Sequence, residues 1–271
     1  MSNTIYLGEL TWDEAKDAIN SSDFIILPTG SFEQHGLHLP LLTDSIRAEA
    51  ISRLLALKAK EEGLKVYLLS LVPYGVSEHH IRFPGTVSLD PETYVRVIES
   101  IGKSLAFHGA KRLLILNFHG GNSAPLQIAS SLITSKYGLR TYLIGWTNFA
   151  RKYIEEHLSP DPNWGHACEH ETSMIMFIRP ELVKLNKVRK PIVLSLGEGR
   201  GENRVVTFLY FDEISDTGGL GDPLRSSTER VPEILDKTNT DIVNTMKRIL
   251  EFEKTIAYSS FSNARPISLR K

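Results

Sequence analysis

The sequence predicts an α/β fold built on a mainly parallel sheet with helices on both faces. Four apolar segments have the length of buried strands and recur along the chain, at 24–28, 66–72, 112–117 and 139–146. They alternate with segments in which apolar residues recur at helical spacing. This alternation is typical of parallel sheets, because the helices that join the strands also cover both faces.

Local signals place the helices between these strands. Thr11 and Glu14 match a capping box, which starts a helix over the segment TWDEAKDAIN. Asp90, Pro91 and Glu92 form a second start signal, because a capping side chain, a proline and a carboxylate follow one another at the positive helix end. Further helices are expected from 44 to about 60, from 91 to His108, after NFHGGNSAP to about Lys136, and over 148–157.

The second half of the chain combines a polar segment with a long amphipathic one. SPDPNWGHACEHETS starts at 159 and runs into Met174–Ile178, which predicts a loop followed by a helix. Val205 to Phe211 has the pattern of a late strand, 218–223 predicts turns, and Ile234 to Thr255 predicts an amphipathic helix. No repeat or low-complexity linker divides the sequence, so we expect a single domain over 1–271 with a loose tail from about 261.

Composition and charge disfavour several classes of protein. The chain has 271 residues, 41% of them hydrophobic, and a net charge of −1, which gives no reason to expect binding to nucleic acid or to an anionic membrane. Cys168 is the single cysteine, so no intrachain disulfide can form and a reducing compartment is expected. No stretch reaches the roughly 18 apolar residues of a membrane span. We therefore expect a cytoplasmic protein.

The stretch 24–47 contains the first candidate site. An apolar strand ends in a loop that holds Glu33 and His35, and Asp44 stands where the next helix begins. Residues at i and i+2 of an extended segment project to the same side, so Glu33 and His35 can face one site. Carboxylates can bridge two cations and imidazole can bind one, so this set could begin a two-metal centre with nitrogen and oxygen ligands. The alternative is that Asp44 caps the helix and the loop residues form hydrogen bonds.

Histidines gather in the loops that follow the predicted strands. Seven of the nine lie in four loops: His35 and His38, His79 and His80, His119, and His166 and His170. Because three of these loops follow strands, they can converge at one edge of the sheet. The HGGN motif at 119–122 can also be read as a tight turn or as an anion cradle before a helix. Within 166–173, the simplest reading is a polar helix start, but a site role for His166 or Glu171 is favoured.

Nucleophilic catalysis has little support in the sequence. Cys168 is read as a small buried residue rather than a nucleophile, because no neighbouring feature activates it. Ser31 and Ser173 lack the G-x-S-x-G elbow of serine hydrolases.

Five motifs together resemble the creatininase (creatinine amidohydrolase) family. They are LPTGSFEQHGLHLPLLTD, YGVSEHHIRFPGT, NFHGGN, HACEHETS and GLGDP, in this order over roughly 24–223. The resemblance implies a three-layer α/β/α sandwich around a central, mainly parallel sheet. It also implies a metal-dependent amidohydrolase that acts on carbon–nitrogen bonds other than peptide bonds, uses two divalent ions and no organic cofactor, and often forms a hexamer.

The resemblance also implies which residues hold the ions. The implied metal ligands are Glu33, His35, Asp44, His119 and Glu171. Asp44 would bridge the two ions. Glu33 and His119 would serve one ion, and His35 and Glu171 the other. Zinc, manganese and iron all suit such nitrogen and oxygen ligands.

Four further residues are implied in catalysis and substrate binding. His166 would be the catalytic residue that takes a proton from a metal-activated water and delivers it to the leaving nitrogen. Ser77 and the backbone of Gly120 fall where substrate is contacted. Trp164 lies near the place where creatininase uses an aromatic flap.

One position departs from creatininase itself, which has a glutamate two residues after the metal-binding histidine. Here that position is Gly121. The missing carboxylate argues against creatinine as the substrate, and we expect the glycine to widen the pocket. Arg82 could then meet a phosphate, although a solvent-facing arginine is the commoner reading.

The predicted function is therefore hydrolysis of a small-molecule amide, either a cyclic amide or a formamide. One alternative is an archaeal-type deformylase of a formylaminopyrimidine nucleotide in flavin and deazaflavin synthesis, and another is a peptidase that acts on a modified peptide. An alternative of a different class is a non-catalytic protein that binds nucleotides or phosphosugars through HGGN. The sequence leaves open the roles of Glu169, His79, His80 and Arg82.

Overall fold

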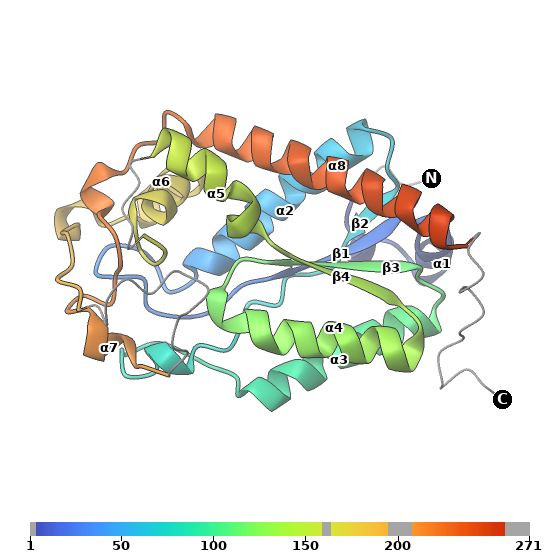
Figure 1. Ribbon diagram of the computed structural model, residues 1–271, viewed down its shortest axis with the longest axis horizontal. Coiled ribbons are helices and arrows are strands. Elements are labelled where there is room, and N and C mark those ends of the chain that lie inside the picture. Colours follow the sequence, from blue (N-terminus) through green and yellow to red (C-terminus); the bar gives the residue numbers. More distant parts are fainter. Residues whose placement is uncertain (1–3, 159–163, 195–207, 258–271) are drawn as a thin grey trace.

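The computed structural model describes residues 4–158, 164–194 and 208–257, and its centre is a four-stranded parallel sheet. The strands are β1 (Phe24–Thr29), β2 (Val66–Leu68), β3 (Arg112–Asn117) and β4 (Arg140–Gly145), in the order β2-β1-β3-β4 (Figure 1). All four predicted strands are confirmed. β2 is shorter than predicted, but the N–H groups of Leu69 and Val72 still donate to carbonyls of β1, so the chain stays beside β1 beyond Leu68.

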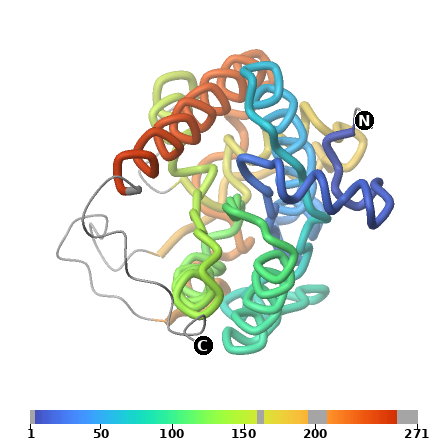
Figure 2. Tube along the Cα trace, turned by 90° about the vertical axis from the view of Figure 1, so that its right-hand side faces the viewer, coloured from blue at the N-terminus to red at the C-terminus, as the bar shows by residue number. Residues whose placement is uncertain are grey.

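Helices cover both faces of this sheet, as predicted. They are α1 (Trp12–Ser21), α2 (Thr43–Glu61), α3 (Pro91–Phe107), α4 (Ser123–Tyr137), α5 (Trp146–His157), α6 (Glu169–Ile178), α7 (Phe211–Ile214) and α8 (Val231–Ala257). Figure 1 shows α2, α5 and α8 on one side of the sheet and α3 and α4 on the other. Figure 2 shows the same layers from the side, with α2 and α8 above the strands and α3 and α4 below them.

Alternation along the strands explains the two layers. Phe24 and Ile26 of β1 pack into the core shared with α2, α5 and α8, whereas Ile25 and Leu27 pack into the core shared with α3 and α4. All four side chains are at most 1% exposed. A strand that is buried on both faces must be apolar throughout, which is why these strands appear as continuous apolar runs rather than alternating ones.

The helix starts agree with their sequence signals. The Asp90 carboxylate accepts a hydrogen bond from the Thr93 N–H at 2.9 Å, as an N-cap does. The Glu14 carboxylate accepts one from the Thr11 N–H at 2.9 Å, which is half of the capping box. No helix in the described ranges is both long and apolar enough to cross a membrane.

The predicted late strand is wrong where it can be examined. Residues 205–207 lie outside the described part of the chain, residues 208–210 form no strand, and Phe211 begins helix α7. The Glu213 carboxylate accepts a hydrogen bond from the Tyr210 N–H at 2.9 Å, so a local cap favours a helical turn here. The predicted loose tail from about 261 also lies outside the described residues.

Candidate metal centre

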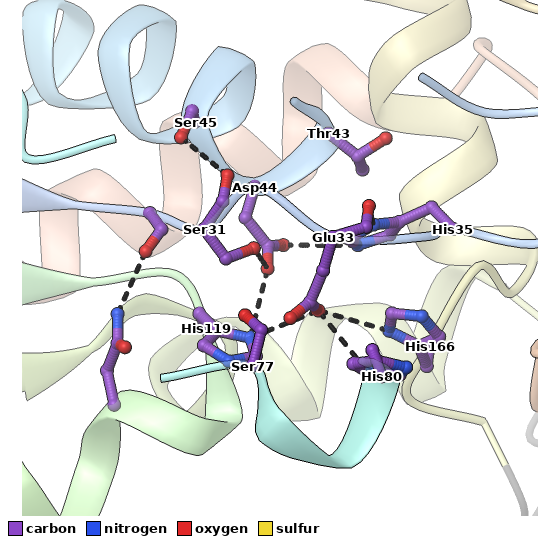
Figure 3. Close-up of polar contacts among 12 residues, drawn as sticks. Ser31, Glu33, His35, Thr43, Asp44, Ser45, Ser77, His80, His119 and His166 are labelled. Carbon is purple, nitrogen blue, oxygen red and sulfur yellow. Dashed lines mark hydrogen bonds and ion pairs between the residues drawn. The ribbon is translucent and has the colours of Figure 1, made fainter. Parts of the chain in front are cut away.

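Five buried side chains meet where the loops after β1 and β3 reach the first turns of α2 and α6. They are the residues that the family resemblance implies as ligands, namely Glu33, His35, Asp44, His119 and Glu171. Their elements are far apart in the sequence, and parallel strands bring them to one edge of the sheet. Figure 3 shows Asp44 with Glu33, His35 and His119 around it.

Asp44 lies at the middle of this cluster, with its two oxygens directed at different imidazoles. Oδ1 is 3.5 Å from His35 Nε2, and Oδ2 is 3.3 Å from His119 Nδ1 (Figure 3). Ser31 Oγ donates a hydrogen bond to Oδ2 at 2.8 Å. The N-cap of α2 is Leu42, so Asp44 does not cap the helix. Its two oxygens therefore face the two histidines on opposite sides of the cluster.

Both imidazoles are oriented through the nitrogen that faces away from the cluster. His35 Nδ1 lies 3.2 Å from the backbone oxygen of Glu33, and His119 Nε2 lies 2.9 Å from that of Val76. A carbonyl accepts hydrogen bonds only, so these nitrogens carry the protons in the neutral rings. The opposite nitrogens then direct lone pairs at the carboxylates, an arrangement that is typical of metal-binding histidines.

Several buried polar atoms of the cluster lack a hydrogen-bond partner among the described residues. They are both oxygens of Glu33 and Nε2 of His35. A carboxylate that is fully buried is costly to keep without partners. A cation between these groups would provide the missing interactions, so the donor set fits a metal ion.

The charges of the cluster point the same way. Burial opposes a charge on His35, but the carboxylates of Asp44, Glu171 and Glu33 outweigh it and raise the pKa of His35 to about 9. Burial is likewise outweighed at His119, where Glu33 and Asp44 raise the pKa well above its usual value. The buried carboxylates therefore stabilise positive charge beside them. Protons on the histidines supply this charge when no metal is bound, and divalent cations would supply it when metal is bound.

Arg47 is a buried part of the site that the sequence did not reveal. One guanidinium nitrogen, Nη1, donates to Asp44 Oδ1 at 3.1 Å and to Glu171 Oε1 at 2.5 Å. It thereby fixes α6 relative to α2. The one available signal was its position three residues after Asp44, on the same face of the helix.

His166 lies beside the cluster with a defined tautomer. Its Nε2 is 2.8 Å from the backbone oxygen of Gln34 and must donate to it, which leaves Nδ1 unprotonated at 3.8 Å from Glu33 Oε1. Burial, reinforced by the charge on His35, lowers the pKa of His166 to about 3. The ring is therefore neutral at pH 7, and its Nδ1 lone pair lies on the side of Glu33.

The short helical turn Glu78–His80 adds two histidines whose roles the sequence left open. His80 Nδ1 lies 2.7 Å from the side-chain amide nitrogen of Gln34, and its Nε2 lies 3.5 Å from Glu33 Oε1. The His79 ring is stacked on the His119 ring, with centroids 5.5 Å apart. Both histidines therefore border the cluster around Asp44.

Of the three residues implied in substrate binding, Ser77 is buried, Gly120 is exposed, and Trp164 packs against other residues. Ser77 precedes this turn, and its buried hydroxyl has no partner in the described structure. Gly120 is exposed, with open space beside its Cα. Trp164 is not brought to the cluster. It is buried, its ring meets His170 edge-on at 5.7 Å, and the Arg151 guanidinium lies 4.7 Å from its centroid.

Arg82 and Cys168 lie outside the chemistry of the site. The Arg82 guanidinium is 3.4 Å from Asp212 and 3.3 Å from Glu213 of α7, so acidic partners already occupy it. Cys168 is fully buried, and burial, together with Glu171 and Glu169, raises the pKa of its thiol to about 12. This agrees with a structural cysteine.

Gly121 does not widen the pocket as expected from the sequence. A Cβ at this position would overlap the Val76 carbonyl oxygen and would lie 2.5 Å from His119 Nε2 and 2.8 Å from His79 Cε1. Neighbouring atoms therefore already fill the space that a side chain would take. Any larger residue here would displace the loop that carries His79.

Comparison with known proteins identifies the wider group to which the chain is related. A family model described as creatininase, creatinine amidohydrolase, matches residues 8–246. Creatinine amidohydrolase of Pseudomonas putida is 30% identical over 203 residues, which are 69% of this chain and 77% of the relative.

Two further proteins match over a larger share of their length. The mycofactocin precursor peptide peptidase of Mycobacterium tuberculosis (strain H37Rv) is 30% identical over 253 residues, which are 89% of this chain and 92% of the relative. A solved structure titled "Creatininase Mn" has a TM-score of 0.78 at 24% identity and covers 91% of this chain and 98% of its own. This last likeness supports the fold.

Proposed function

Because this chain belongs to the creatininase family of metal-dependent hydrolases that act on non-peptide carbon–nitrogen bonds, we propose that it opens a small cyclic amide or a formamide. The observation that carries this proposal is the position of Asp44, whose two oxygens face His35 and His119 at 3.5 and 3.3 Å. A shared carboxylate between two such groups is suited to a two-metal site. It is not needed by a protein that only binds an anion at a helix start.

Two divalent cations, zinc, manganese or iron, would be held by the five clustered side chains. Glu33 and His119 would hold one, His35 and Glu171 the other, and Asp44 both. Such ions, when bound, would lower the pKa of a bound water and polarise the amide carbonyl. Arg47 would keep Asp44 and Glu171 in place through its two hydrogen bonds.

The protein residues would contribute proton transfer and orientation. The unprotonated Nδ1 of His166 lies on the cluster side of the ring and would take the proton of the attacking water. As the tetrahedral carbon collapses, the same nitrogen would return the proton to the leaving nitrogen. The buried, unpartnered hydroxyl of Ser77 and the exposed backbone of Gly120 would contact the substrate.

A peptide amide is a second candidate substrate, and a specific observation favours it. The peptidase relative aligns over 89% of this chain, against 69% for the creatinine amidohydrolase at the same identity. The nucleotide deformylase has no comparable support, because Arg82 is paired with Asp212 and Glu213.

A panel of amides assayed with zinc, manganese and iron(II) tests the proposal. It should contain cyclic amides, formamides, creatinine and a short peptide. We expect turnover of a cyclic amide or formamide and poor turnover of creatinine, since Gly121 supplies no carboxylate. Creatinine turnover at an ordinary enzymatic rate, on the order of 10 s⁻¹, would overturn the argument from Gly121. Cleavage of the peptide alone would favour the second candidate.

A further inference from the structure

The imidazole of His79 lies at one end of the cluster without a polar partner among the described residues. Its side chain is half-buried, and none of its ring nitrogens has a hydrogen bond or an ion pair among the described residues. Its ring lies almost parallel to that of His119, with an interplanar angle of 6° and centroids 5.5 Å apart. One nitrogen of His79, one of His119 and one oxygen of Glu33 all lie within 4.8 Å of one another. Three donors at such separations can share one cation.

The glycine at position 121 is what allows His79 to come this close. Any Cβ there would lie 2.8 Å from His79 Cε1 and 2.5 Å from His119 Nε2. Real Cβ atoms do not approach other atoms so closely, so a side chain at 121 and the observed position of His79 exclude each other. His79 therefore occupies the space that a side chain at position 121 would need.

His80, the neighbouring histidine, is committed to other partners. The side-chain amide of Gln34 approaches its Nδ1 at 2.7 Å, and its Nε2 faces Glu33 Oε1 at 3.5 Å. If the amide donates to Nδ1, Nε2 carries the proton and its N–H faces the carboxylate without forming a hydrogen bond to it. His80 therefore has no lone pair left for a cation, whereas His79 keeps one.

We propose that His79 is a further protein ligand of the ion that Glu33 and His119 hold. The proposal rests on the proposed function, since it assumes that the cluster binds metal. A neutral imidazole adds no negative charge to this site. Imidazole favours zinc and iron, whereas carboxylates favour manganese, so His79 would shift the preference of this one ion toward zinc or iron.

Metal content of the purified full-length protein tests this without reference to activity. Wild type, His79→Ala and the control His108→Ala are loaded with zinc, dialysed against a chelator of graded strength and analysed for metal. His108 is an exposed residue at the C-terminal end of α3, away from the cluster. We expect wild type and His108→Ala to keep two ions per chain. His79→Ala should lose one ion, because its affinity for zinc at that site should be about 10-fold to 100-fold weaker.

The variant His79→Glu is a second test, because it replaces the imidazole by a carboxylate, a ligand that favours manganese. We expect it to regain the second ion and to take up more manganese relative to zinc than wild type does. Unchanged zinc content and affinity in a folded His79→Ala would overturn the proposal, and so would a His79→Glu variant that binds no better than His79→Ala. If wild type itself binds no metal, the proposed function has failed, which is a different outcome.

Discussion

At the scale of single residues, the site is organised by which nitrogen of each histidine is held by the backbone. His35 and His119 each direct one nitrogen to a main-chain carbonyl and the other to Asp44. The sequence indicated these residue types and their loops. It did not reveal the roles of Arg47 and Gln34, because each of them also binds a partner that lies far away in the chain. The hydrogen bond from Arg47 to Glu171 spans 124 residues, and the contact of Gln34 with Gly218 spans 184.

Replacing Asp44 by alanine tests the bridging role. We expect Asp44→Ala to lose both ions, because one carboxylate faces both halves of the cluster. His119→Ala and His35→Ala should each weaken mainly one ion. Elemental analysis after dialysis measures this directly. Two ions per chain in Asp44→Ala would show that the carboxylate bridges nothing.

Replacing His166 tests the separation of proton transfer from metal binding. His166→Ala should lower kcat by about 10²-fold or more, since general acid–base groups contribute factors of this size. Its metal content should stay near that of wild type, because the proposed ligands are other residues. Loss of metal from this variant would instead make His166 a ligand.

At the scale of elements, regular structure was predictable wherever local signals agreed with burial. The apolar runs of β1 and β3 and the cap at Asp90 were readable because each depends on neighbouring residues. The segment that ends in α7 was misread, because its apolar residues resemble a strand while the bond between Tyr210 and Glu213 favours a helical turn. The order of the strands could not be read, since it depends on contacts between distant segments.

Helix α2 offers a matched test of how packing holds the site. Ile51 is fully buried in the core between α2 and the sheet, whereas Leu54 on the same helix is 39% exposed. Ile51→Ala should lower the free energy of unfolding by about 2–5 kcal/mol, the usual cost of such a deletion in a core. Leu54→Ala should change it by less than about 0.5–1 kcal/mol. Denaturant unfolding of both metal-free variants measures the difference, and equal losses would contradict the described orientation of α2.

At the scale of the whole molecule, the parallel sheet explains why residues from two loops and two helices meet. Parallel strands end at one edge, so β1 and β3 deliver Glu33, His35 and His119 to the same place, and α2 and α6 bring Asp44 and Glu171. The same edge holds the turn of His79 and His80. Function is thus located by topology, while its chemistry is set by individual side chains.

Assembly is a property of the whole molecule that the family resemblance predicts. We expect a homo-oligomer, specifically a hexamer with six times the chain mass of 30.4 kDa. Multi-angle light scattering on the protein at micromolar concentration measures it. A stable monomer would remove this prediction.

The central claim is that the cluster around Asp44 hydrolyses amides by means of bound divalent metal. Amide turnover before chelation, after chelation and after metal is restored tests it most directly. We predict that the chelated protein stays folded by circular dichroism, loses turnover, and regains it on addition of zinc, manganese or iron(II). Full turnover by protein shown to contain no metal would contradict the account.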